Sequence, residues 1–287
     1  MPAEGYIPVP GGRVWYQVHG QDTGGIPLLC LHGGPGLPHD YIEALADLAD
    51  RRPVIFYDQL GCGRSDRPDD TALWTVERFT DELVAVREAL QLERLHLFGS
   101  SWGGMLALWY ALDRQPPLES IIAAGSPASV PRWIAHTRKL RADLPTDVRA
   151  VLDRHEAAGF FDCPEFIGAV AVFYQRHLCR LSPWPDGLER AFAGLGVAVY
   201  QTMWGPTEFG PVWGTLKDWD LTDRLKEIDI PTLLTVGRFD ECPADHVADM
   251  RDRMPRAELV VFEHGSHLHF CDERERYMAV TLSLIHI

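Results

Sequence analysis

Residues 95–104 have the sequence Leu95-His-Leu-Phe-Gly99-Ser100-Ser101-Trp102-Gly103-Gly104, in which an apolar run leads into the pattern G-x-S-x-G. An apolar helix is predicted to follow over residues 105–112. A serine between a strand and a helix sits on a tight turn, where flanking glycines remove Cβ atoms that would otherwise collide. The segment therefore predicts that Ser101 is a nucleophile, with an ordinary glycine-rich turn as the alternative.

Strands and helices alternate on both sides of this segment. Apolar runs predict strands at residues 13–19, 28–31, 54–57, 95–98, 121–124, 232–236 and 259–262. Helical spacing occurs at residues 41–48, 76–90, 105–112 and 244–254, and a last helix begins at Glu273. This order predicts an α/β fold with a mostly parallel sheet that is covered by helices on both faces.

The alternation stops at about residue 127, and strand-like runs return at residues 232–236. The intervening segment 127–213 is rich in Arg, Pro, Trp and Phe and has helical spacing at 166–178 and 188–200. We therefore expect a core formed by residues 1–126 and 214–287, with 127–213 as an inserted helical cap. The last six residues, LSLIHI at 282–287, look like the translation of a sequencing-adapter end. We expect them to be non-native and the last helix to be truncated.

Two later loops supply partners for the serine. A serine hydroxyl is a weak nucleophile and needs a base that is itself oriented by an acid. The arrangement resembles the α/β-hydrolase fold, in which the acid and then the histidine follow late strands. Asp240 and His267 occupy those positions and are predicted to complete a catalytic triad. The alternatives are a solvated Asp240, and His264 or His269 as the base.

The motif His32-Gly33-Gly34-Pro35-Gly36 follows the strand at 28–31, where such enzymes carry the second oxyanion donor. We predict that the backbone N–H groups of Gly34 and Trp102 form the oxyanion hole. A plain Gly/Pro turn is the alternative, and His32 is expected to be a structural hydrogen-bonding residue. We also expect Asp58 and Arg64 to be structural residues beside this turn.

Composition limits the partners and the location. The formal charge of −14 and the lack of a Lys/Arg-rich run argue against nucleic acid. The first 12 residues do not resemble a secretory signal, and no apolar run is long enough to span a bilayer. The six scattered cysteines indicate reduced thiols in a cytoplasmic protein, although one of them could be a reactive thiol. We expect neither a metal nor an organic cofactor.

Three motifs together resemble the proline iminopeptidase family: residues 32–36, the segment Asp58-Gln-Leu-Gly-Cys-Gly-Arg-Ser65, and Gly99-Ser-Ser-Trp-Gly-Gly104. The segment 214–219, Gly-Thr-Leu-Lys-Asp-Trp, is most similar to members described as L-amino-acid or L-proline amide hydrolases. Ser100 and Gly104 differ from the Gly and Ser that are commoner in the iminopeptidases. The resemblance implies release of a small N-terminal residue, preferably proline, from a peptide or amino-acid amide through an acyl-enzyme.

The same resemblance implies an amine-binding site. Glu208, in Trp204-Gly-Pro-Thr-Glu208-Phe, and Glu241 match the two places where the family carries acidic residues for the free α-amino group. Two carboxylates facing a closed pocket supply the charge that a buried ammonium group needs. Surface acids are the alternative. Aromatic residues of the cap could cover a pyrrolidine ring, and each could instead be cap core: Trp204, Phe209 and Trp213.

Two rival functions stay open at the level of sequence. An esterase or a C–C bond hydrolase can use the same fold and triad, because fold does not fix function. A non-catalytic binding protein with a hydrolase-like fold is the other alternative. The oligomeric state is unknown.

Overall fold

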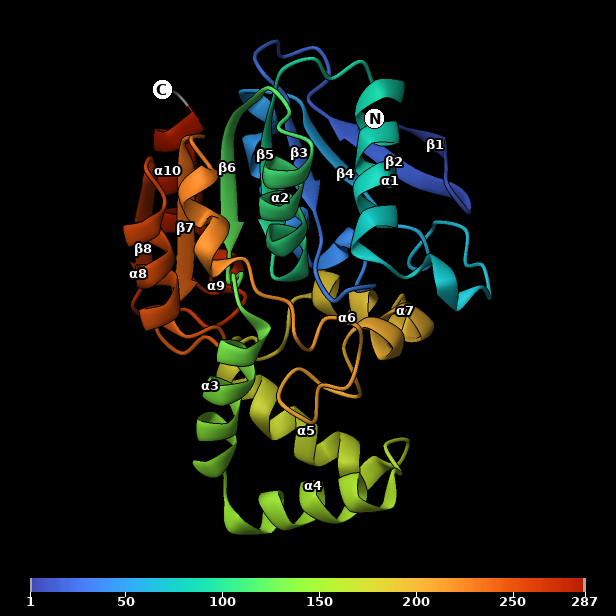
Figure 1. Ribbon diagram of the computed structural model, residues 1–287, viewed down its shortest axis with the longest axis vertical. Coiled ribbons are helices and arrows are strands. Elements are labelled where there is room, and N and C mark those ends of the chain that lie inside the picture. The colour runs from blue at the N-terminus through green and yellow to red at the C-terminus, as the bar shows by residue number, and fades with distance from the viewer. Residues whose placement is uncertain (1, 286–287) are drawn as a thin grey trace.

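The protein is described by a computed structural model over residues 2–285, with an eight-stranded sheet at its centre (Figure 1). The strand order is β1-β2-β4-β3-β5-β6-β7-β8. β1 and β2 pair antiparallel to each other, β2 pairs antiparallel with β4, and the other neighbouring strands are parallel. The strands are β1 (Ala3–Val9), β2 (Gly12–His19), β3 (Leu28–Leu31), β4 (Val54–Tyr57), β5 (Leu95–Ser100), β6 (Leu118–Ala124), β7 (Thr232–Gly237) and β8 (Ala257–Phe262).

Helices cover both faces of the sheet, which confirms the predicted fold class. Every residue of β3, β4, β5 and β7 is buried. One hydrophobic core packs α1 (Val76–Ala89), α2 (Trp102–Asp113) and α8 (Ala244–Arg253) on one face. A second core on the other face packs η1 (His39–Asp50), α9 (His269–Asp272) and α10 (Arg274–Ile285).

Three local predictions differ from the structure. The segment 41–48, predicted as an ordinary helix, belongs to the 3₁₀ helix η1, because apolar spacing at 41, 42, 45 and 48 buries one face in either helix type. The sequence pattern does not predict β1, because Gly5 and Pro8 interrupt it. Residues 188–200 form parts of two helices instead of one, because the chain turns between Gly194 and Gly196.

The chain leaves the sheet after β6 and returns to it at β7. Between them lie α3 (Val130–Ala142), α4 (Thr146–Ala158), α5 (Pro164–His177), α6 (Asp186–Ala193) and α7 (Val197–Met203). Figure 1 shows these helices beyond the carboxyl ends of the parallel strands. The helices α3, α4 and α5 share a core of their own around Leu152, Phe166 and Phe173, whereas α6 and α7 pack into the two cores of the sheet. All five helices fall inside residues 127–213, and the division into core and cap units stays a prediction.

Residues 282–287 are predicted to be non-native. The last two of them, 286–287, lie outside the residues that the structure describes. The predicted last helix is α10. Within residues 2–285, no helix is long and apolar enough to cross a membrane.

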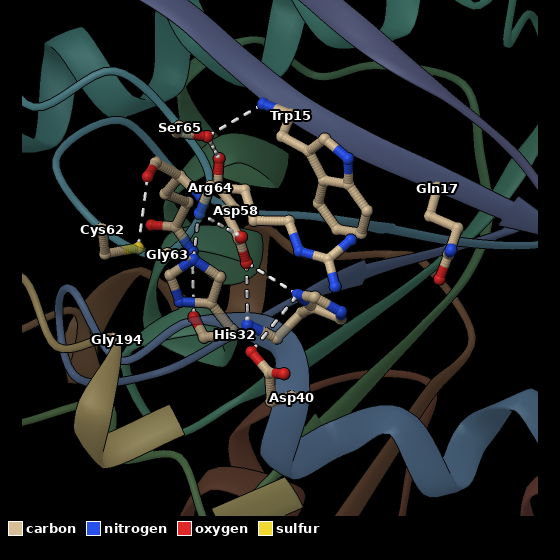
Figure 2. A network of polar contacts seen from close by, with 12 residues as sticks. Trp15, Gln17, His32, Asp40, Asp58, Cys62, Gly63, Arg64, Ser65 and Gly194 are labelled. Atoms are coloured by element: carbon tan, nitrogen blue, oxygen red, sulfur yellow. Dashed lines mark hydrogen bonds and ion pairs between the residues drawn. The ribbon is translucent and has the colours of Figure 1, made fainter. Parts of the chain in front are cut away.

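Asp58, directly after β4, connects the loops on this edge of the sheet (Figure 2). Its Oδ1 accepts hydrogen bonds from His39 N at 3.0 Å and His39 Nδ1 at 2.7 Å, and its Oδ2 accepts one from Arg64 N at 2.9 Å. The Arg64 guanidinium lies over the Trp15 ring at 4.3 Å. Burial alone would raise the pKa of Asp58, but the hydrogen bond and charge of His39 hold it below the ordinary value.

We expect Asp58→Asn to destabilise the fold by about 3–5 kcal/mol, because it breaks a buried charged network and leaves donors unpaired. Urea unfolding at neutral pH measures the loss. Asp223→Asn is the matched control, because the Asp223 side chain is 99% exposed, and it should leave the midpoint almost unchanged.

Since the folded-state pKa of Asp58 is lowered, its contribution should be complete above the unfolded value of about 3.9 and disappear as the pH falls further. An unchanged urea midpoint for Asp58→Asn would contradict the structural role of the network.

Candidate active site

Ser101 occupies a strained turn between β5 and α2. Its φ is +54° and its ψ is −120°, a region that residues with a side chain rarely adopt. Its N–H donates to the carbonyl of Ala124 at the end of β6, at 2.8 Å. The first N–H groups of α2, beginning with Trp102, have no intrahelical acceptor. The turn thus holds the serine beside free backbone donors and the positive end of a helix dipole.

The glycines of this turn allow α2 to approach three strands. A Cβ on Gly99 would lie 2.3 Å from the Gly103 carbonyl oxygen, and a Cβ on Gly103 would lie 2.2 Å from that of Leu31. A Cβ on Gly104 would lie 2.0 Å from Ser126 Oγ. Gly104, one of the departures from the commoner family pattern, is therefore matched to Ser126 in the loop after β6.

Asp240 and His267 form a buried hydrogen-bonded pair. His267 Nδ1 donates to Asp240 Oδ1 at 2.7 Å, and the two residues are 4% and 3% exposed. Asp240 Oδ1 also accepts from the N–H of Cys242 at 2.7 Å. With the proton on Nδ1, Nε2 of His267 is the nitrogen that can accept a proton from a hydroxyl.

The two competing histidines do not share this geometry. His269 is fully buried, with Nε2 2.8 Å from Thr235 Oγ1 and Nδ1 3.1 Å from the Ser266 carbonyl. Burial lowers the pKa of His269 to about 4, so it is a neutral structural residue at ordinary pH. His264 is exposed at the tip of the loop.

Gly125 brings the serine turn and the Asp240–His267 pair together. It follows Ala124, whose carbonyl holds Ser101. A Cβ on Gly125 would lie 2.8 Å from His267 Nδ1 and 3.1 Å from Asp240 Oδ2. The three predicted triad residues thus gather around the carboxyl end of β6.

The end of α5 binds the loops that carry His267 and Asp240, a contact that the sequence does not reveal. The N–H groups of His267 and Leu268 each donate at 2.8 Å, to the carbonyls of His177 and Leu178 respectively. The Nδ1 of His177 lies 2.9 Å from the carbonyl of Phe239, the residue before Asp240. The helical segment therefore positions the histidine loop and the acid loop directly.

The glycine turn after β3 lies against Ser101. A Cβ on Gly33 would lie 3.0 Å from Ser101 Cβ, and the N–H of Gly33 donates to the Tyr41 hydroxyl at 2.6 Å. The next residue, Gly34, has a φ of +106°, which favours glycine.

His32, which precedes the turn, is a buried structural residue. Its Nε2 accepts from the N–H of Gln59 at 2.8 Å. Burial lowers the pKa of His32 to about 4, which keeps the ring neutral. It holds the turn against the loop that follows β4.

Glu241 and Glu208 are near enough for their charges to interact, but only Glu241 is fully buried. Glu241 is 0% exposed, with Oε1 4.0 Å from His267 Nε2, and Glu208 is partly buried in the loop after α7. The Tyr174 hydroxyl of α5 donates to Glu208 Oε2. Burial, then the charges of Glu208 and Asp240, raise the pKa of Glu241 well above its usual range.

Aromatic rings lie between the Glu208 loop and His267. Trp133 of α3, which the sequence patterns do not single out, packs edge to face with Trp204 at 5.7 Å and with His267 at 5.6 Å. Its Nε1 donates to the carbonyl of Glu208 at 2.9 Å. Phe209 belongs to the helical core, and Trp213 is 50% exposed. Of the three predicted aromatics, only Trp204 joins this cluster.

A cavity of about 500 Å³ lies beside Glu208. Its walls include Tyr174, Tyr200 and Glu208 together with mostly apolar residues of α5, α6 and α7, but not Ser101, His267 or Glu241. Such a volume is in the range that holds an organic ligand. Over residues 2–285, no group of three or more His, Cys, Asp or Glu side chains is arranged to hold a metal ion.

Comparisons of the sequence and of the structure with known proteins both find proline iminopeptidases. The family model for the alpha/beta hydrolase fold matches residues 26–273. Proline iminopeptidase of Heyndrickxia coagulans is 42% identical over 281 residues, which are 98% of this chain and 97% of that protein. The crystal structure of proline iminopeptidase from Mycobacterium smegmatis has a TM-score of 0.90 and 40% identity, covering 99% of this chain and 98% of that one.

The crystal structure of VinJ is also similar over its whole length. It has a TM-score of 0.96 and 39% identity, and the match covers 100% of this chain and 99% of that one.

We expect Gly104→Ala to destabilise the protein by about 1–3 kcal/mol, because the new Cβ meets Ser126 in a closely packed turn. Adding Ser126→Gly should recover most of the loss, as thermal unfolding of both variants would show. Gly168→Ala is the control: its Cβ meets no atom within 4 Å in an exposed part of α5, so it should stabilise by roughly 0.5–1 kcal/mol. Equal stability of Gly104→Ala and the native protein would contradict the tight approach of α2.

Proposed function

Because the chain belongs to the proline iminopeptidase family of α/β-hydrolases, we propose that it releases a small N-terminal residue, preferably proline, from peptides or amino-acid amides. The observation that carries this proposal is Glu241, a buried carboxyl group without a hydrogen-bond partner in the described part of the chain, 4.0 Å from the candidate base. A site built only for a neutral ester would gain nothing from it, because an unpaired buried acid is costly.

Ser101 is the proposed nucleophile, His267 the base and Asp240 the orienting acid. His267 Nε2 takes the hydroxyl proton as Ser101 attacks the substrate carbonyl, and Asp240 stabilises the imidazolium that forms. The imidazolium then protonates the leaving amine, so the C–N bond breaks and an acyl-enzyme remains. A water molecule repeats the sequence, with His267 as base, and releases the N-terminal residue.

The proposed oxyanion hole consists of the N–H groups of Gly34 and Trp102. The N–H of Gly33 is already bonded to Tyr41, so the next N–H of that turn, that of Gly34, is the proposed donor. Trp102 begins α2, where the N–H has no acceptor within the helix. Donors fixed before the reaction stabilise the developing negative charge without reorganisation.

Glu208 and Glu241 are the proposed ligands of the substrate ammonium group, with Trp204 beside them. The peptide or amide would enter between the core and residues 127–213, which we propose to act as a cap. The proposed location is cytoplasmic, which the six free thiols support.

We expect Ser101→Ala and His267→Ala each to lower turnover of a prolyl arylamide by several orders of magnitude. The double variant should be little worse than either single one, because the residues act as a unit. Asp240→Asn should cost on the order of 10⁴ in kcat, because it favours the wrong histidine tautomer. Full activity of Ser101→Ala, or a silent Asp240→Asn, would require a different triad.

We expect Glu208→Gln and Glu241→Gln each to lower kcat/KM on the prolyl arylamide by roughly two to three decades, as for breaking a buried charge pair. An amine-free ester of similar size should lose little, and the two losses should not add, because both carboxylates share one cation. Acetylating the substrate amine should abolish cleavage while a fluorophosphonate still labels Ser101. Losses under about threefold, or cleavage of the acetylated substrate, would favour an esterase over an aminopeptidase.

A further inference from the structure

Glu241 is a buried acid to which the fold offers neither a hydrogen-bond donor nor a cation in the described part of the chain. It is 0% exposed, and neither carboxylate oxygen has a hydrogen-bond partner within the described part of the chain. The 4.0 Å from its Oε1 to His267 Nε2 is too long for a hydrogen bond. An ionised carboxylate there would lose its hydration with nothing in exchange.

The surroundings of Glu241 add negative charge and no permanent cation among residues 2–285. The titratable groups around it come from its own loop, from three cap segments and from the loop after β8: Asp240, Cys242, Glu208, Tyr174, Tyr200 and His267. The imidazole of His267 is already bonded to Asp240 through Nδ1. Arg132, on α3, is paired with Asp249 at 2.7 Å.

Glu208 and Glu241 differ in whether their carboxylate has a hydrogen-bond donor. Glu208 is partly buried, and its Oε2 already accepts the Tyr174 hydroxyl. Its charge therefore has a donor before any ligand arrives, whereas that of Glu241 has none in the described chain. Two like charges that interact also favour a proton on the less solvated acid, which is Glu241.

We propose that Glu241 is protonated in the free protein and that its proton is released when the substrate ammonium group binds. This inference rests on the proposed function, because it needs an amine at the two glutamates. One proton leaves the carboxylic acid for the solvent, and one ammonium group takes its place beside the carboxylate. One positive charge leaves and one arrives, so the net charge of the site is the same before and after binding.

The exchange makes amine recognition dependent on pH. In the complex Glu241 must be ionised, whereas in the free protein its pKa is raised. Affinity for an ammonium ligand should therefore be full above the raised pKa and fall as the pH drops below it. An amine-free ester needs no such ionisation, so its binding should not follow this curve.

Isothermal titration calorimetry can count the proton directly. L-Prolinamide is titrated into Ser101→Ala, which cannot turn it over, in buffers of different ionisation enthalpy. The pH is held between about 5 and 7, below the ordinary α-amino range, so that the ligand stays an ammonium ion. We expect release to approach about one proton per bound ligand at the acid end and to decline as the pH rises.

Variants of the three candidate residues test which side chain releases the proton. Adding Glu241→Gln should remove the release or abolish binding, while Glu208→Gln and, separately, His267→Ala should keep the release in whatever binding remains. Release that persists in Glu241→Gln, or disappears in His267→Ala, would overturn the assignment to Glu241.

The remaining outcomes separate the inference from the function on which it rests. Binding without proton exchange overturns the inference alone. An affinity that falls with added K⁺ does the same, because a metal cation and not a proton would then neutralise Glu241 in the free protein. Failure of L-prolinamide to bind at any of these pH values contradicts the proposed amine site and the inference together.

Discussion

The close approach of the first turn of α2 to the ends of β3, β5 and β6 is the constraint on which the rest of the site depends. Three glycines permit it, because a Cβ at Gly99, Gly103 or Gly104 would lie within 2.3 Å of a neighbouring atom. The approach places Ser101 in a conformation with positive φ and ties its N–H to Ala124. The strain is local, and the surrounding packed sheet holds it in place.

The serine turn and the strand ends could be predicted from the sequence because they depend on local patterns. Apolar runs give the parallel strands, and Asp240 and His267 follow two of them at the positions that the fold requires. The helices α3 and α4 could not be predicted individually, because they bury few apolar residues: α4 has only Leu152 fully buried. Periodicity carries little signal in such helices.

Contacts between distant segments could not be predicted. Trp133 lies between His267 and the Glu208 loop, although it is far from both in the sequence. The attachment of α5 to the histidine loop uses backbone groups, which leave no trace in residue identity. Glu208 and Glu241 can be singled out in the sequence only through the family resemblance. Only the structure shows that the two glutamates differ in their partners: Tyr174 donates a hydrogen bond to Glu208 and not to Glu241.

The attachment of α5 also limits how the helical segment can move. Its last carbonyls, at His177 and Leu178, hold the backbone on which the candidate base is carried. A swing of the entire segment away from the sheet would break these bonds and displace His267 at the same time. Any motion that admits a ligand and keeps His267 in place must therefore leave these two hydrogen bonds intact. Opening of the site and alignment of its base are thus mechanically linked.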